Sequence, residues 1–109
     1  MRVFLTGGTG FIGSYLINRL HQNGFDVICL KRKNSEPRIS LEKEPDWIIG
    51  QLGNGKLKNL PTSDIIIHLA AAGVKASSRD LYDCCLSNIV GTSELLGFMD
   101  KMPKKPVLL

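Results

Sequence analysis

Glycines recur every third residue directly after a short apolar run near the N-terminus. Residues 6–13 read TGGTGFIG and follow the apolar residues 3–5. Gly7 allows a sharp turn out of a strand, Gly10 allows a phosphate to approach the backbone, and Gly13 allows a helix to lie close to that strand. The first amides of such a helix have no partners within it and carry partial positive charge, so they attract an anion. This spacing predicts a site for the pyrophosphate of a dinucleotide, with a glycine-rich turn that binds nothing as the alternative.

The expected phosphate contacts come from this turn and from the first turn of the helix that follows. They are Gly7, Gly10, Phe11, Ile12 and Gly13. No Gly-Lys-Ser or Gly-Lys-Thr sequence follows the glycines, so the segment is not a Walker-type phosphate loop.

Apolar patterns predict the strands and helices that would position this turn. Continuous apolar runs are typical of strands covered on both faces, whereas apolar residues three or four apart are typical of a helix. The predicted strands cover about 2–6, 26–31, 47–50, 64–69 and the start of a fifth at 107–109, and the predicted helices cover about 11–23 and 79–102. The alternation predicts an α/β fold in one domain over residues 1–109: a partial Rossmann-type doubly wound parallel sheet of about four to five strands with flanking helices.

The second predicted helix is expected to bury one stripe of side chains. Its residues spaced three or four apart are Leu81, Cys85, Ile89, Thr92, Leu96 and Met99. Ser77 or Ser78 is expected to cap the start of this helix, because Asp80 follows Ser77 at the spacing of a capping box. The polar segment 33–46 shows no strong period and is expected to be a loop.

The composition is that of an ordinary globular domain and argues against several classes of function. The chain has 109 residues, of which 43% are hydrophobic and 22% are charged. Its net charge of +4 comes from lysines and arginines dispersed among ten acids without interleaved aromatics, so nucleic-acid binding is not expected. No apolar run approaches the roughly 20 residues of a membrane span, and no secretory signal is expected. Cys29, Cys84 and Cys85 lack metal-ligand spacing and favour reduced thiols in a cytoplasm.

Two further motifs follow the glycine-rich turn in a fixed order. Residues 64–71 read DIIIHLAA and residues 88–92 read NIVGT. Together with TGGTGFIG they are similar to the TGxxGxxG, DxVxHLAA and NVxGT patterns of the extended short-chain dehydrogenase/reductase family. The chain resembles this family of nucleotide-sugar epimerases, dehydratases and reductases over nearly its whole length, which corresponds to the N-terminal third of a typical member.

The resemblance implies further cofactor contacts. Leu69, Ala70 and Ala71 would form a wall beside the ribose or nicotinamide, since small residues at the carboxyl edge of a sheet leave room for a ligand. The alternative is that they allow close helix packing.

Asn88 is expected to make a specific hydrogen bond near the active-site backbone, because asparagine is a mediocre helix former, with an ordinary surface residue as the alternative. His68 is expected to be a hydrogen-bonded structural residue and not a catalyst.

Two departures from the family pattern bear on the cofactor. The acid that usually follows the second strand and holds the ribose hydroxyls of NAD is replaced by Lys31 and Arg32. Cationic side chains attract a 2′-phosphate, so the chain is expected to bind NADP(H) in preference to NAD(H), with Arg32 as the best partner because its planar fork suits phosphate. A solvated basic loop is the alternative. Family members commonly have an Asp after the third strand that accepts a hydrogen bond from the adenine amine. This chain has Gln51 and Leu52 there, and the Gln51 amide oxygen can still accept that hydrogen bond.

The catalytic pair of the family does not occur in this chain. The family uses Tyr-x-x-x-Lys with a nearby Ser or Thr, whereas Tyr15 is followed four residues later by Arg19 and Tyr82 by Leu86. No catalytic residue and no metal site are therefore expected. The leading hypothesis is the NAD(P)-binding segment of a nucleotide-sugar epimerase, dehydratase or reductase, inactive by itself. The alternatives are a non-catalytic NADP-binding sensor or regulatory module, and a truncated fragment without function.

The apolar ending at residues 107–109 leads to two more expectations. A strand that stops as it begins is typical of a domain that is incomplete at its C-terminus, so the chain is expected to be part of a longer protein whose missing region would bind the nucleotide sugar. Surfaces that later strands would cover are then exposed, and self-association through the incomplete sheet edge is expected.

Overall fold

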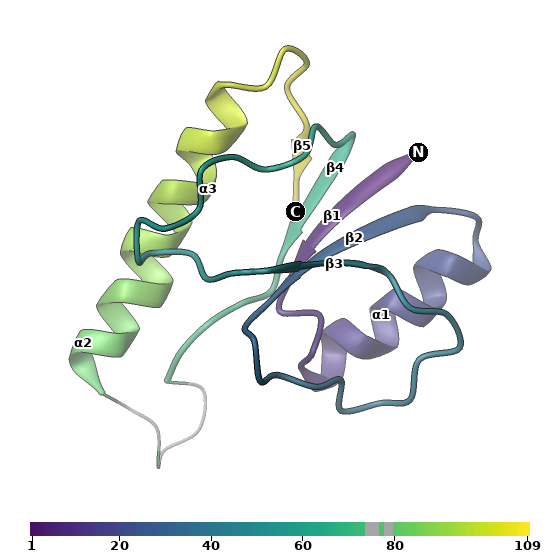
Figure 1. Cartoon of the computed structure of the whole chain (residues 1–109), viewed down its shortest axis with the longest axis horizontal. Helices are drawn as coiled ribbons and strands as arrows, with labels where there is room; N and C mark the ends of the chain where they lie inside the picture. The colour runs from purple at the N-terminus through teal and green to yellow at the C-terminus, as the bar shows by residue number, and fades with distance from the viewer. Residues whose placement is uncertain (74–76, 78–79) are drawn as a thin grey trace.

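The computed structural model describes residues 1–73, 77 and 80–109, and a five-stranded sheet runs through its centre (Figure 1). The strands are β1 (Arg2–Thr6), β2 (Asp26–Lys31), β3 (Asp46–Ile49), β4 (Ile65–His68) and β5 (Val107–Leu108). They lie in the order β3-β2-β1-β4-β5, and each neighbouring pair is parallel. The chain therefore crosses over the central strand β1 between β3 and β4. This arrangement confirms the predicted α/β fold with a doubly wound parallel sheet.

Helices lie on opposite sides of the sheet (Figure 1). The helix α1 (Phe11–Gln22) connects β1 to β2. A second, continuous helix precedes β5 and consists of α2 (Leu81–Cys84), a π-helical stretch η2 (Cys85–Val90) and α3 (Gly91–Asp100). The predicted loop at 33–46 is confirmed up to the first residue of β3.

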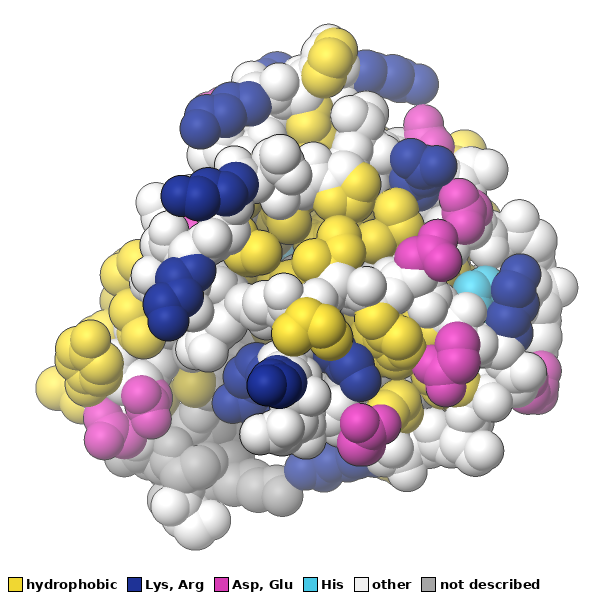
Figure 2. All heavy atoms as spheres, in the orientation of Figure 1, with side chains coloured by type: hydrophobic (Ala, Val, Ile, Leu, Met, Phe, Trp, Pro, Cys, Tyr) yellow, Lys and Arg dark blue, Asp and Glu magenta, His cyan; other side chains and the backbone are white. Residues whose placement is uncertain are grey.

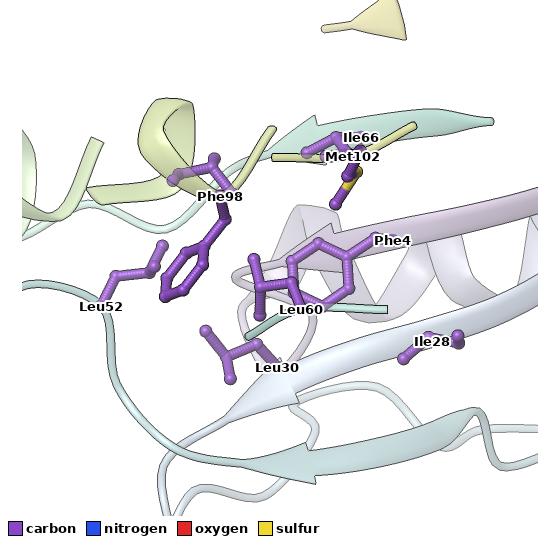
Figure 3. Packing of buried hydrophobic residues seen from close by; sticks show 9 residues of the cluster. Phe4, Ile28, Leu30, Leu52, Leu60, Ile66, Phe98 and Met102 are labelled. Carbon is purple, nitrogen blue, oxygen red and sulfur yellow. The ribbon is translucent and has the colours of Figure 1, made fainter. Parts of the chain in front are cut away.

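Alternate residues of the strands pack against the two sides, as the period of a strand requires. On the α3 side a cluster of buried side chains fills the space between sheet and helix (Figure 3). Its members are Phe4, Ile28, Leu30, Leu52, Leu60, Ile66, Leu95, Phe98 and Met102. On the α1 side the buried residues are Leu5, Ile17, Val27 and Cys29. The central strand β1 thus contributes to both cores, which fixes the position of the residues that follow it.

The buried face of the second helix differs from the predicted stripe. Leu81 and Ile89 are 81% and 66% exposed, and Figure 2 shows apolar side chains gathered at the lower left, where Figure 1 places α2. The residues of α3 that are buried are Gly91, Leu95 and Phe98. The predicted stripe is wrong for its exposed members, which are Leu81, Cys85, Ile89 and Leu96, whereas Met99 packs against the α3-side core. This helix carries apolar residues on two adjacent stripes, and spacing alone does not tell which stripe meets the sheet.

The cap of the same helix also differs from the prediction. The Asp80 carboxylate accepts hydrogen bonds from the backbone amides of Tyr82 at 2.8 Å and Asp83 at 3.2 Å. Asp80 is therefore the N-cap, as expected for a short acidic side chain before a helix. The predicted cap at Ser77 is wrong because the helix begins at Leu81, and Ser78 lies outside the described residues.

The last strand leaves its apolar residues open to solvent. Although β5 pairs with β4, the apolar residues at this end of the chain are exposed, namely Val107, Leu108 and Leu109. Self-association at this edge stays a prediction. Within residues 1–73, 77 and 80–109, none of the helices combines the length and the hydrophobicity needed to cross a bilayer.

Candidate functional site

The glycine-rich turn packs against two other segments of backbone at the carboxyl edge of the sheet. Gly7 has a φ of +76°, a conformation that residues with a side chain rarely adopt. A Cβ at Gly7 would lie 2.7 Å from the backbone of Leu69 and Ala70, just past β4. A Cβ at Gly13 would overlap the Gly7 carbonyl oxygen and lie 2.7 Å from the Gly8 Cα. The turn is therefore wedged between α1 and the end of β4. The close approach of α1 at Gly13 agrees with the glycine spacing, whereas the contact with the end of β4 is a finding of the structure.

The N-terminus of α1 is open. Its N-cap is Gly10, which has no side chain to bond the first amides, and the first turn of α1 contains no acidic residue. Phe11 and Ile12, the first two residues of α1, are exposed. A Cβ at Gly10 would meet the Gly7 carbonyl oxygen at 3.3 Å, a tight contact but far less severe than the overlap at Gly13. Internal packing thus constrains Gly10 less than Gly13, and Gly10 adjoins the first amides of α1, where the helix dipole attracts an anion.

The buried thiol of Cys29 packs against the same turn. The Cys29 side chain on β2 packs against Gly8, and a Cβ added at Gly8 would overlap the Cys29 Sγ. Burial raises the pKa of the Cys29 thiol to about 12, so the group stays protonated and unreactive. Cys29 is therefore a packing residue, as the sequence predicts for a cysteine inside a strand.

The loop that follows β2 runs along α1 and returns to the glycine-rich turn. The amide of Arg38 donates to the Thr9 carbonyl oxygen at 3.1 Å. The buried Ser14 hydroxyl donates to the Gly10 carbonyl oxygen at 2.6 Å and accepts from the Ile39 amide at 3.2 Å. These bonds bring the exposed Arg38 next to the glycine-rich turn. Sequence reasoning missed Arg38, because only the folded loop places it there.

Lys31 and Arg32 occupy different surroundings although they are neighbours in sequence. The Lys31 ammonium lies 4.9 Å from the centre of the Trp47 ring, 3.3 Å from the Ser35 carbonyl oxygen and 3.6 Å from the Glu36 carboxylate. Its side chain is only 13% exposed. These contacts make Lys31 a structural residue that holds the following turn.

Arg32 instead lies on the surface of that turn. The Ser35 amide donates to the Arg32 carbonyl oxygen at 3.1 Å, which closes a tight turn. Arg32, Lys33, Asn34 and Ser35 line a shallow hollow. Two cationic side chains beside hydrogen-bonding groups favour an anion there.

The segment past β4 is fixed from the second helix. Leu69, Ala70 and Ala71 are exposed where β4 ends. Asn88, in the π-helical stretch, accepts from the Ala72 amide at 2.8 Å and donates to the Ala72 carbonyl oxygen at 3.0 Å. The specific hydrogen bond predicted for Asn88 is therefore confirmed, and the three exposed residues lie between this clamp and Gly7.

Gln51 and Leu52 follow β3 and differ in exposure. The Leu52 side chain is buried in the α3-side core, so only its backbone can face a ligand. Gln51 is half-buried. Gly53 has a φ of +93°, and a Cβ there would lie 2.5 Å from the Leu86 carbonyl oxygen in the π-helical stretch. The adenine contact of Gln51 stays a prediction.

His68 is hydrogen-bonded through both ring nitrogens. Its Nδ1 lies 2.6 Å from the Thr6 hydroxyl, and its Nε2 lies 3.0 Å from the Thr92 hydroxyl. The prediction of a hydrogen-bonded histidine is confirmed. Burial lowers the pKa of His68 below its usual value of 6.5, because removing the ring from water disfavours the charged form.

We expect this histidine to make the protein less stable in mild acid. An unfolded chain protonates His68 near pH 6.5, whereas the folded chain resists protonation until the pH reaches its lower pKa. The unfolded state therefore binds more protons in this window, and the free energy of unfolding falls as the pH falls through it. Denaturant titrations between about pH 7.5 and 5.5 should show a larger loss for the wild-type protein than for His68→Gln. Equal losses would contradict the assignment.

Comparison with known proteins gives one family and several relatives. The model of the NAD dependent epimerase/dehydratase family matches residues 3–109. A putative dihydroflavonol 4-reductase from Synechocystis is 34% identical over 99 residues, which cover 90% of this chain and 29% of that protein.

Two solved structures illustrate the likeness in fold. The UDP-glucose 4-epimerase of Thermotoga maritima with UDP-glucose has a TM-score of 0.77 at 29% identity, covering 93% of this chain and 34% of the other. A human epimerase family protein with NADPH has a TM-score of 0.71 at 27% identity, covering 97% of this chain and 34% of the other. The chain thus spans about a third of the length of the proteins it matches.

Proposed function

This chain belongs to the NAD-dependent epimerase/dehydratase family, and we propose that it forms the dinucleotide-binding part of a nucleotide-sugar epimerase, dehydratase or reductase. The observation that carries the proposal is the open N-terminus of α1, held against the end of β4 by Gly7 and Gly13. When bound, the cofactor supplies a nicotinamide that exchanges a hydride with a carbon of the substrate.

The residues at this edge of the sheet fit such a cofactor. The amides at the start of α1 provide donors for a pyrophosphate, and Gly10 leaves the approach to them free of a side chain. Leu69, Ala70 and Ala71 offer a narrow exposed wall beside the turn, suited to a flat ring or a ribose. Gln51 stands past β3, where an adenine would meet its amide.

The substrate class is supported by a neighbour and not by a pocket in this chain. The Thermotoga structure contains UDP-glucose, and this chain spans 34% of it. We therefore assign the sugar contacts and the catalytic Tyr-x-x-x-Lys pair to the part of the family that this chain does not span. By itself, the chain is proposed to bind the cofactor without turning over a sugar. A cytoplasmic location is proposed from its three free cysteines.

We further propose that the dinucleotide is NADP(H) in preference to NAD(H). Arg32 lies in the turn after β2, and Arg38 is brought beside Thr9 by its own backbone hydrogen bond. Both are exposed and cationic, whereas Lys31 is occupied by Trp47, Ser35 and Glu36. These observations support Arg32, the partner favoured from the sequence, as the 2′-phosphate contact, with Arg38 as a second candidate, whereas Lys31 is engaged in contacts of its own.

Titration with NADPH and NADH tests both proposals. We expect NADPH to bind more tightly, and Arg32→Ala to weaken NADPH about ten- to hundredfold while leaving NADH nearly unchanged, because one charge-assisted hydrogen bond contributes about 1.5–3 kcal/mol. Nicotinamide fluorescence gives the affinities. Arg19→Ala, at an exposed arginine far along α1, is the matched control and should change neither affinity.

The outcomes separate the two claims. Failure of both dinucleotides to bind the folded wild-type chain would contradict the proposed function. Equal affinity for both, with no effect of Arg32→Ala, would contradict only the preference for NADP(H).

A further inference from the structure

A chain of hydrogen bonds joins three elements behind the candidate site. Thr6 is the last residue of β1, His68 is the last residue of β4, and Thr92 lies in the first turn of α3. The His68 ring bridges the two hydroxyls at 2.6 Å and 3.0 Å. The Thr6 hydroxyl oxygen also accepts from the Ala70 amide at 3.2 Å. This series of hydrogen bonds therefore runs from the Ala70 amide in the exposed wall to Thr92 in the second helix.

One arrangement of hydrogens satisfies this chain of bonds. The Thr6 oxygen accepts from Ala70, so its own hydrogen is free to go to His68 Nδ1. The ring hydrogen then sits on Nε2 and is donated to the Thr92 hydroxyl oxygen. The opposite tautomer would leave the Thr6 hydroxyl hydrogen without the Nδ1 acceptor. A neutral ring with its hydrogen on Nε2 is thus the favoured form.

The same region is fixed by backbone contacts. The Leu69 amide donates to the Thr6 carbonyl oxygen at 3.2 Å, and Gly7 lies so close to Leu69 and Ala70 that a Cβ would not fit. Any rotation of the peptide at Ala70 would therefore displace the glycine-rich turn as well. The position of the wall and the position of the turn are set together.

The second helix holds this wall at two places. Asn88 bonds both polar atoms of the Ala72 backbone, and Thr92, four residues later, bonds His68. Residues four apart on a helix lie on the same side, so both side chains reach the end of β4 from one surface. Asn88 bonds the wall directly, whereas Thr92 bonds the His68 ring, which in turn bonds Thr6 on β1.

We propose that His68 and Thr92 are positioning residues that lock the Ala70 amide and thereby align the wall with the phosphate-binding turn. Neither side chain is proposed to contact the cofactor. Their role is to keep the two surfaces in one fixed arrangement, which reduces the ordering required when a dinucleotide binds. The effect on affinity rests on the function proposed above, whereas the effect on the Ala70 amide does not.

Paired substitutions at Thr92 test the proposal. Thr92→Val keeps the shape but removes the hydroxyl, and Thr92→Ser keeps the hydroxyl but removes a methyl group. We expect Thr92→Val to speed hydrogen exchange of the Ala70 amide about tenfold and to weaken NADPH about tenfold, and Thr92→Ser to restore both. Thr62→Val, at an exposed threonine before β4, is the matched control and should change neither quantity.

The two readouts keep the proposals apart. If the wild-type chain binds no dinucleotide, the proposed function fails and the exchange of the Ala70 amide alone decides the positioning role. Wild-type exchange in Thr92→Val, or a Thr92→Ser variant that exchanges as fast as Thr92→Val, would overturn it.

A measurement on the unmodified protein covers the case in which Thr92→Val does not fold. Nitrogen chemical shifts of the His68 ring should show a protonated Nε2 and a bare Nδ1 as distinct signals. Signals averaged between the two tautomers would contradict the locked ring.

Discussion

Replacing Gly13 with alanine is expected to lower the free energy of unfolding by more than about 3 kcal/mol or to prevent folding. The new Cβ would overlap the Gly7 carbonyl oxygen and approach the Gly8 Cα to 2.7 Å. Both neighbours are backbone atoms, and the turn they belong to is already pressed against Leu69 and Ala70. Relief would require α1 to move away from the sheet, which would open the core around Ile17. Denaturant unfolding followed by circular dichroism measures the loss.

Gly97→Ala is the control for this substitution. Gly97 lies in α3, and a Cβ there would meet no atom within 4 Å. Alanine in an exposed helix is favoured over glycine by about 0.5–1 kcal/mol, so this variant should be slightly more stable than the wild-type protein. A Gly13→Ala variant as stable as Gly97→Ala would refute the close packing of α1 on the turn.

Replacing Gly10 with alanine should instead preserve the fold and abolish most dinucleotide binding. Gly10 has a φ of −70° and a ψ of 173°, which alanine adopts freely, and its Cβ would lie 3.3 Å from the Gly7 carbonyl oxygen. The methyl group would stand beside the amides of α1, which are the proposed pyrophosphate donors. Losing several charge-assisted hydrogen bonds should weaken NADPH and NADH alike by at least about a hundredfold, or about 2.7 kcal/mol.

The measurement pairs an unfolding curve with a nicotinamide titration on the same Gly10→Ala sample. A stable variant with wild-type affinity would show that no phosphate lies against this turn. A variant that unfolds like Gly13→Ala would show that Gly10 is needed for packing. Gly97→Ala again serves as the control, with unchanged affinity expected.

Elements with strong local signals could be predicted from the sequence. The bounds of β1 and β2 were predicted to the residue, and α1 ends one residue earlier than predicted. These segments combine continuous apolar runs, a glycine-rich turn and a helix stop, all within about 30 residues. The buried face of α3 was predicted only in part, since Met99 packs against the core but Leu96 is exposed and Leu95 is buried. Leu95 and Leu96 lie on adjacent apolar stripes, and packing against the sheet decides between them.

The site was predictable where it depends on neighbouring residues in the chain. The turn requires residues without side chains at Gly7 and Gly13, and the glycine spacing of the sequence motif shows this requirement directly. Arg38 was missed because its position depends on a backbone bond across a loop to Thr9. Lys31 illustrates the converse case. Its charge was visible in the sequence, but its packing over Trp47 depends on the pairing of β2 with β3.

The order of the strands has a consequence for how the chain folds. β1 pairs with residues 26–30 on one side and with residues 65–68 on the other. The first pairing needs only a short segment of chain, whereas the second must close a much longer loop, at a greater cost in chain entropy. One edge of β1 therefore stays unpaired until β4 arrives. During synthesis or refolding, this interval is when the chain is most open to pairing with strands of other molecules.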